Sequence, residues 1–298
     1  MTRWFVTGHG GQLATAFEEL LARDSSAEVV SMDEATTDLR DRMAVSRLVR
    51  EARPDVVLHT AAYTAVDAAE SDAETAFAVN EGGTRNLVEA LRDTPGTTEP
   101  PVPLVYFSSD YVFDGRKTRP YVESDATAPL SVYGRSKLAG ERAALAWPAG
   151  IVVRTAWLFS PTGGNFVKTI LRVAAERVEQ AGQADPEPLT VVDDQVGSPT
   201  YAPHLAPRVI EALTLGMPPG IWHMAGSGYC SWMEFAQEIV RCAGLRIDVE
   251  PITTEELGRP APRPPFSALS SERRAPVLPP WQDGVAAAVR ALRAAPAA

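Results

Sequence analysis

Short apolar runs alternate with helix-like segments through the first half of the chain, and this alternation restricts the fold more than any other feature. The apolar runs lie at residues 3–7, 29–32, 55–59, 104–107 and 150–154. Apolar residues recur at helical spacing in segments 13–22, 42–52, 72–92 and 131–146. Continuous apolar runs are typical of strands that helices cover on both faces. The order therefore predicts an α/β fold, a doubly wound parallel sheet of the Rossmann type with right-handed crossovers.

The second half of the chain is less regular. Residues 180–188 and 259–280 are rich in proline and are predicted to form loops. We therefore expect a smaller C-terminal α/β lobe, in which the alanine-rich C-terminus forms an amphipathic helix. The expected division is a first domain at 1–157 with a returning segment near 189–224, and a second lobe at 158–188 and 225–298.

The acidic composition argues against partners that are themselves anionic. The 298 residues include 28 Lys and Arg against 38 Asp and Glu, a formal net charge of −10, and they show no basic stripe. We therefore expect neither nucleic acid nor a membrane surface as a partner. Cys230 and Cys242 lack metal-ligand spacing, as do the histidines, so we expect no metal site. Few thiols, no leader and no membrane-spanning run predict a cytoplasmic location.

A glycine-rich turn stands between the first predicted strand and the first predicted helix. Gly8 permits a tight turn, Gly11 lets the backbone approach a phosphate, and Ala14 is small enough for helix–strand packing. The helix that follows presents free N–H groups and the positive end of its dipole. This context predicts a dinucleotide pyrophosphate site at Gly8, Gly11, Gln12 and Leu13. The first domain would then bind the dinucleotide and the second lobe the substrate.

Acidic residues follow the second predicted strand, where dinucleotide-binding folds hold the adenosine ribose. Asp33 closes this strand, and its carboxylate is placed to accept hydrogen bonds from the ribose hydroxyls, which would disfavour the extra phosphate of NADPH. Asp38 and Leu39, with Asp41 close by, can instead line the adenine. The sequence leaves open which carboxylate does which, and a solvated acidic loop is the alternative for each.

Three polar side chains follow the fourth predicted strand or lie on the helix after it. Tyr133 and Lys137 are one helical turn apart and project from one face. A phenol has a pKa near 10, and an adjacent ammonium is expected to lower that pKa toward the range of acid–base catalysis. Ser109 ends the strand, where its hydroxyl can orient a substrate carbonyl. We predict that Ser109, Tyr133 and Lys137 are catalytic.

Several longer motifs resemble those of the dTDP-4-dehydrorhamnose reductases, nucleotide-deoxysugar 4-ketoreductases within the extended short-chain dehydrogenase superfamily. The resemblance spans nearly the whole chain. Its most specific stretches are residues 61–67 (AAYTAVD), 109–115 (SDYVFDG), 132–141 (VYGRSKLAGE), 165–169 (NFVKT) and 191–200 (VVDDQVGSPT). It implies a Rossmann-type reductase that uses NADPH or NADH to reduce the C4 ketone of a dTDP-linked 6-deoxysugar.

The resemblance also implies roles at matching positions. Tyr133 would give a proton to the sugar C4 oxygen, and Lys137 would hold the nicotinamide ribose and tune Tyr133. Ser109 stands where the family more often has Thr and keeps the hydroxyl. The matching cofactor-binding positions are Gly11, Gln12, Leu13, Asp33, Asp38, Leu39, Ala62, Tyr63 and Thr64. The substrate-binding positions are Ser109, Asp110 and Trp157, and Arg263 is our candidate for pairing with the phosphates.

Departures from the family pattern leave the sugar open. Ala156 stands where Ser is usual, and the 260–264 stretch lacks the first of two usual arginines. The substrate is therefore dTDP-4-dehydro-L-rhamnose or another 4-keto dTDP-deoxysugar of a specialised-metabolite pathway. Asn80 fits either a helix position that supports the site or a plain surface position.

Two rival functions share this fold. Sugar dehydratases generally place Asp-Glu after the active hydroxyl, whereas Tyr111 follows Asp110 here, which argues against dehydration. A non-catalytic, cofactor-binding regulatory subunit, like that of methionine adenosyltransferase, also resembles the family. The intact Ser109, Tyr133 and Lys137 favour catalysis over such a role. The sequence does not distinguish a monomer from a homodimer.

Overall fold

A six-stranded parallel sheet forms the centre of the larger lobe in the computed structural model, which describes residues 1–294. Its strand order is β10-β5-β4-β3-β1-β2. The strands are β1 (Thr2–Thr7), β2 (Ala27–Met32), β3 (Val56–His59), β4 (Leu104–Ser109), β5 (Gly150–Thr155) and β10 (Gly220–His223). Because all six strands are parallel, their carboxyl ends meet at one edge, and the chain moves outward in both directions from β1. The predicted doubly wound fold is confirmed.

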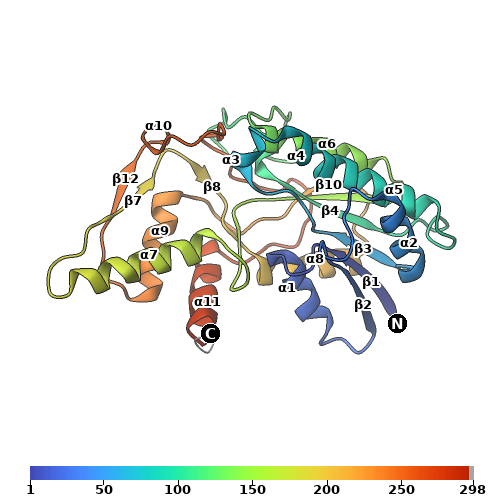
Figure 1. The fold of residues 1–298 in the computed structure, drawn as a ribbon, viewed down its shortest axis with the longest axis horizontal. Helices are drawn as coiled ribbons and strands as arrows, with labels where there is room; N and C mark the ends of the chain where they lie inside the picture. Colours follow the sequence, from blue (N-terminus) through green and yellow to red (C-terminus); the bar gives the residue numbers. More distant parts are fainter. Residues whose placement is uncertain (295–298) are drawn as a thin grey trace.

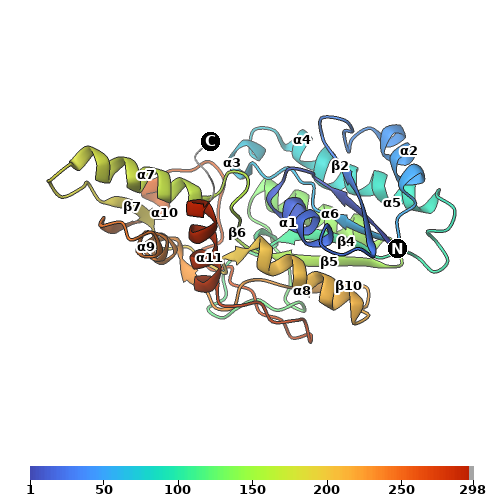
Figure 2. The same cartoon turned by 90° about the horizontal axis from the view of Figure 1, so that it is seen from below.

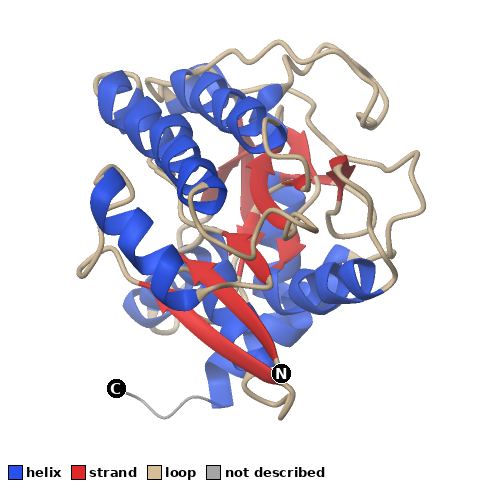
Figure 3. Ribbon diagram, turned by 90° about the vertical axis from the view of Figure 1, so that its right-hand side faces the viewer, coloured by secondary structure: helices blue, strands red, loops and turns tan. Residues whose placement is uncertain are grey.

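Helices cover both faces of this sheet (Figures 1 and 3). One face packs against α1 (Gln12–Leu21) and α8 (Ala202–Thr214), the other against α2 (Arg42–Ala52), α5 (Thr84–Arg92) and α6 (Val132–Leu145). Side chains of β1 show why: Trp4 and Val6 belong to the first apolar cluster, and Phe5 to the second. Successive residues of a strand point to opposite faces of the sheet, so an unbroken apolar run packs against the helices on both faces.

The helix expected at 72–92 is instead three pieces. They are α4 (Ala73–Phe77), the wider π-helical turn η1 (Ala78–Gly83) and α5; the short helix α3 (Val66–Ala69) precedes them. The buried Asn80 side chain donates hydrogen bonds to the Tyr63 carbonyl and the Ser136 hydroxyl, 3.2 and 2.9 Å away. These bonds, formed with residues outside the helix, accompany the widened turn, a feature common near functional sites.

The smaller lobe lies beside the carboxyl ends of the strands (Figures 1 and 2). Its core lies among α7 (Phe166–Ala181), α9 (Trp232–Ala243) and α11 (Trp281–Ala294). Three strand pairs complete it: β7 (Leu189–Val192) with β12 (Val249–Ile252), β8 (Val196–Gly197) with β11 (Cys230–Ser231), and β6 (Leu158–Phe159) with β9 (Thr200–Tyr201). The short α10 (Thr254–Leu257) follows β12.

The segment expected to return to the main sheet does so only in part. The strand β7, at 189–192, pairs with β12 in the smaller lobe, and only α8 and β10 join the large one. The apolar run at β7 is too short to reveal from its own sequence which sheet it enters. The expected C-terminal helix is α11; residues 295–298 of the predicted second lobe lie outside the described residues. Within residues 1–294, no helix is long and apolar enough to cross a membrane.

Helix α6 approaches the sheet so closely that a glycine is required. A Cβ on Gly140 would lie 2.2 Å from the Tyr106 hydroxyl and 2.5 Å from the Asn80 carbonyl. We predict that Gly140→Ala lowers the free energy of unfolding by about 1–3 kcal/mol. Gly82→Ala is the control, because its Cβ would have no neighbour closer than 3.9 Å. Urea unfolding measures both, and a Gly140→Ala protein as stable as the wild type would contradict this packing.

Candidate active site

A cleft of about 800 Å³ lies at the carboxyl ends of the strands. The turn after β1 lines it, as do the loops after β2 and β3, the end of β4, the start of α6 and the segment after β5. Most of the predicted site residues line it: Gly8, Gly11, Gln12, Leu13, Asp38, Leu39, Ala62, Tyr63, Thr64, Ser109, Tyr133, Lys137 and Trp157. Asp33, Asp110 and Arg263 are not in its lining.

The glycine turn after β1 has the geometry that a diphosphate group needs. Gly8 has φ +81°, and a Cβ there would lie 2.9 Å from the Ala61 backbone, so the position excludes other residues. Gly10, which sequence reasoning did not single out, also has positive φ, +79°. Gly11 is the N-cap of α1 and offers no side-chain cap, which leaves the first N–H groups of the helix for an anion. The turn therefore fits a dinucleotide.

The loop after β2 holds the predicted Asp33 outside the lining of the cleft. The Asp33 carboxylate turns back to accept a hydrogen bond from the Ala35 N–H at 2.9 Å, the short loop that aspartate favours. Glu34 lines the cleft instead. Arg40, also in the lining, pairs with Asp38 at 2.6 Å. The sequence showed an acidic cluster here, but local turn geometry decides which carboxylate faces the cleft.

The loop after β3 is held in place by the π-helical turn. The Asn80 side chain accepts a hydrogen bond from the Tyr63 N–H at 2.9 Å and donates one to the Tyr63 carbonyl. Its amide also donates to the Ser136 hydroxyl on α6. Asn80 thus ties the cofactor-side loop to the helix that carries Tyr133, which favours the supporting position over the surface one.

Tyr133 and Lys137 enter the cleft from the first turns of α6. Ser131 caps this helix, because its hydroxyl accepts a hydrogen bond from the Gly134 N–H at 3.1 Å. The Lys137 ammonium donates to the Phe107 carbonyl at 2.7 Å and lies 4.3 Å from the centre of the Tyr106 ring. Both Tyr133 and Lys137 are buried. One helix thus delivers a phenol and an ammonium to the end of β4.

The expected lowering of the Tyr133 pKa is wrong for this structure. Burial raises the pKa of the Tyr133 phenol to about 12, and hydrogen bonding to the Ser109 side chain opposes the rise only in part. The ammonium that was expected to lower it instead bonds to the Phe107 carbonyl. Tyr133 therefore holds its proton at neutral pH, as a group that donates a proton to a reduced carbonyl must.

Burial also shifts the pKa of Lys137. Burial lowers the pKa of its ammonium to about 7, and the negative charge of Glu141 opposes this. Glu141 lies one turn further along α6 and forms a buried ion pair with Arg154 at 2.7 Å. The Ser108 hydroxyl also donates to Glu141, at 2.5 Å. Sequence reasoning missed this network; the spacing of Lys137 and Glu141 was its only signal.

Two residues predicted to bind substrate form hydrogen bonds or ion pairs within the protein. Asp110 is buried behind Ser109 and accepts hydrogen bonds from the hydroxyls of Ser109 and Ser267, at 2.9 and 2.5 Å. Arg263 pairs with Asp67 of α3 at 2.9 Å, so its guanidinium joins the smaller lobe to the larger. Ser267 and Asp67 are distant in sequence from Asp110 and Arg263, and no local pattern predicts these two contacts.

Trp157, in contrast, lines the cleft from an unusual backbone conformation. Its φ is +47°, a region that residues other than glycine rarely occupy. Its indole stacks on Trp232 of α9, with ring centres 3.6 Å apart. Such strain persists where the surrounding packing enforces it, often at ligand sites.

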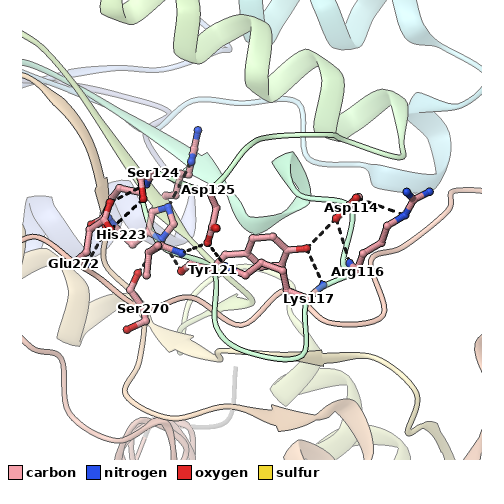
Figure 4. Close-up of polar contacts among 12 residues, drawn as sticks. Asp114, Arg116, Lys117, Tyr121, Ser124, Asp125, His223, Ser270 and Glu272 are labelled. Atoms are coloured by element: carbon pink, nitrogen blue, oxygen red, sulfur yellow. Dashed lines mark hydrogen bonds and ion pairs between the residues drawn. The ribbon is translucent and has the colours of Figure 1, made fainter.

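The long loop between β4 and α6 is fixed by hydrogen bonds around Tyr121. Figure 4 shows Tyr121 at its centre, with its hydroxyl donating to Asp114 at 2.9 Å. The His223 ring lies 3.1 Å from the Tyr121 carbonyl and 2.9 Å from that of Ser270. These contacts tie the loop to β10 and to the chain segment at Ser270. They limit the freedom of the chain that joins Ser109 to Tyr133.

No group of three or more His, Cys, Asp or Glu side chains within residues 1–294 is arranged to hold a metal ion. Asp193 and Asp194, which stand side by side in the sequence, are both engaged in hydrogen bonds. Asp193 accepts from the Ser231 hydroxyl, and Asp194 accepts from the N–H and hydroxyl of Thr254.

Known relatives match this chain over almost its full length. A family model described as RmlD substrate binding domain matches residues 2–294. The dTDP-4-dehydrorhamnose reductase of Sinorhizobium fredii is 39% identical, over 97% of this chain and 97% of that protein. A probable dTDP-4,6-dihydroxy-2-methyloxan-3-one 4-ketoreductase of Streptomyces antibioticus is also 39% identical, over 94% and 91%. The structure of dTDP-4-dehydrorhamnose reductase from Bacillus anthracis in complex with NADP has a TM-score of 0.88 at 34% identity, covering 98% of this chain and 100% of that one.

The buried Asp110 gives the site a measurable pH dependence. Burial raises the pKa of its carboxyl to about 6, against roughly 3.9 for an unfolded aspartate. The folded state then binds the proton more tightly, so this group's contribution to stability is lost as pH rises from about 4 to about 6. We predict that the unfolding free energy of wild type, relative to Asp110→Asn, falls by up to about 3 kcal/mol between pH 4 and pH 7. A constant or rising difference in urea unfolding would contradict this.

Proposed function

The chain belongs to the dTDP-4-dehydrorhamnose reductase family, and from this membership and the geometry of the cleft we propose that it reduces the C4 ketone of a dTDP-linked 6-deoxysugar, converting dTDP-4-dehydro-L-rhamnose to dTDP-L-rhamnose with NADPH or NADH. One observation carries the proposal. Ser109, Tyr133 and Lys137 line the same cleft as the glycine turn that fits a dinucleotide.

The residues that would hold the dinucleotide follow the cleft from β2 to β5. The turn from Gly8 to Leu13 would bind the diphosphate, and Asp38 and Leu39 the adenosine end. Ala62, Tyr63 and Thr64 line the cleft between these and the catalytic side chains. When bound, the reduced nicotinamide supplies the hydride that reduces the sugar carbon.

The three proposed catalytic side chains have different roles in the reaction. The Ser109 hydroxyl donates to Asp110 in this structure, and turning about its C–O bond lets it donate to the ketone oxygen instead. Tyr133 gives its proton to the C4 oxygen, which becomes a hydroxyl. The Lys137 side chain, beside Tyr133 on the same helix face and in the lining of the cleft, would hold the nicotinamide ribose. Trp157 would bound the sugar on the side of the smaller lobe.

A second candidate substrate is supported by one relative and by one residue of the cleft. The probable 4-ketoreductase of Streptomyces antibioticus is as similar to this chain as the Sinorhizobium fredii reductase is. Ala156, which lines the cleft where the family usually has Ser, changes the polarity of the wall beside Trp157. Another 4-keto dTDP-deoxysugar is therefore the alternative substrate.

The location, the partners and the oligomeric state of the protein are also part of the proposal. The low cysteine content and the acidic composition support a cytoplasmic enzyme without nucleic-acid or membrane partners. A monomer and a homodimer both fit, since every predicted site residue lies within one chain. Sedimentation of the purified protein distinguishes them.

The test of function is direct. Purified protein is incubated with dTDP-4-dehydrorhamnose and either NADPH or NADH, and the sugar product is identified. Formation of dTDP-rhamnose supports the proposal, and turnover only with a different 4-keto sugar supports the alternative. Tight dinucleotide binding without turnover of any 4-keto dTDP-sugar would favour a regulatory subunit instead.

Tyr133→Phe removes the transferred proton and little else. We predict that turnover falls by about 10² to 10⁴ or more, while the dissociation constant for NADPH changes little, because the ring still packs between its neighbours. Steady-state kinetics measures the turnover, and fluorescence titration measures the dissociation constant for NADPH. Rates like those of the wild type would remove this phenol from proton transfer.

Lys137→Ala is expected to weaken both properties. It removes the side chain that would hold the nicotinamide ribose and that, through its bond to the Phe107 carbonyl, helps to fix the start of α6 beside Tyr133. We predict lower turnover together with a higher dissociation constant for NADPH. A loss of turnover with unchanged dinucleotide affinity would confine Lys137 to the proton-transfer step.

A further inference from the structure

One hydroxyl in the described part of the chain is buried without a hydrogen bond. Of residues 1–294, only Thr155 has a buried side-chain polar atom that lacks a partner. Burial deprives this hydroxyl of water, and nearly all buried polar groups in native proteins are paired. Thr155 is 93% buried and lines the cleft. An unpaired hydroxyl at a ligand cleft points to a bond that the ligand completes.

The sheet register places Thr155 beside the catalytic serine. Thr155 ends β5, and its Cα partner on β4 is Ser109. The turn that fits the diphosphate follows β1, and the acidic loop expected at the adenosine lies after β2. A dinucleotide lying across the sheet in this order has its nicotinamide over β4 and β5. Thr155 therefore stands at the nicotinamide end.

The other hydroxyls at this end already donate to protein groups. Ser108 donates to Glu141, and Ser109 donates to Asp110. Thr155 alone among these three keeps its proton uncommitted. Rotation about χ1 moves the hydroxyl among three staggered positions, and this lets it reach a ligand in the cleft that Thr155 lines. A threonine hydroxyl both donates and accepts, which matches a carboxamide with one acceptor and two donors.

We propose that the Thr155 hydroxyl binds the carboxamide of the nicotinamide, and so orients the ring beside Ser109 and Tyr133. This inference rests on the proposed function, since it requires a nicotinamide dinucleotide in the cleft. Thr155 acts here as a binding and positioning residue and transfers no proton.

The test compares two ligands and two variants. Thr155→Val keeps the shape and removes the hydroxyl, and Thr155→Ser keeps the hydroxyl. NADH carries the carboxamide, whereas ADP-ribose has the same adenosine, diphosphate and ribose without the nicotinamide. We expect Thr155→Val to weaken NADH binding about tenfold, or about 1.4 kcal/mol, and to leave ADP-ribose binding unchanged within about twofold. Thr155→Ser should bind NADH within about threefold of wild type.

A second measurement separates binding from damage to the fold. Because Thr155→Val removes an unpaired buried hydroxyl, the ligand-free variant should melt at the wild-type temperature or above it. ADP-ribose affinity reports in the same way that the rest of the cleft is intact.

Several results would overturn the inference. Unchanged NADH affinity in Thr155→Val, or equal losses for NADH and ADP-ribose, would show that the hydroxyl does not bind the carboxamide. A higher KM for the sugar with unchanged NADH affinity would assign the hydroxyl to the substrate instead. Wild-type protein that binds neither NADH nor NADPH would overturn the proposed function itself. The Thr155→Val result alone does not overturn it.

Discussion

The close approach of α6 to the end of β4 is the constraint on which the site depends. A Cβ on Gly134 would lie 2.2 Å from the Tyr111 carbonyl, and one on Gly140 would lie 2.2 Å from the Tyr106 hydroxyl. Without side chains at these two positions, the helix lies close enough for the Lys137 ammonium to reach the Phe107 carbonyl. The same approach sets Tyr133 beside Ser109. Two glycines thus determine where the phenol and the ammonium stand.

The burial that comes with this close packing also shifts the pKa values of Tyr133 and Lys137. Burial raises the pKa of Tyr133 to about 12 and lowers that of Lys137 to about 7, so the phenol keeps its proton and the ammonium is easily perturbed. The Glu141 carboxylate, which is paired with Arg154, supplies the negative charge that opposes the lowering of the Lys137 pKa. Breaking a buried ion pair by removing one partner is strongly destabilising, so this network fixes the helix as well as the charge. A site of this kind is poised to donate a proton to a newly reduced oxygen.

The sequence predicted those features that depend on local spacing. The alternation of apolar runs gave the parallel sheet, and the glycine turn and the one-turn separation of Tyr133 and Lys137 identified two walls of the cleft. Contacts that depend on distant partners were not predictable. Arg263 pairs with Asp67, and Asp110 bonds to Ser267, which lies far along the chain. The bond from the Ala35 N–H to the Asp33 carboxylate was likewise not predicted. The unpaired Thr155 hydroxyl is visible only once every neighbour is in place.

The central claim is that hydride reaches C4 of a dTDP-sugar in the cleft that holds Tyr133. The most direct measurement supplies a reduced dinucleotide carrying deuterium at both C4 positions of the nicotinamide, together with dTDP-4-dehydrorhamnose. The account predicts a reduced sugar with one deuterium, bonded to C4 and to no other carbon. A product without deuterium, or with deuterium at another position, would contradict it.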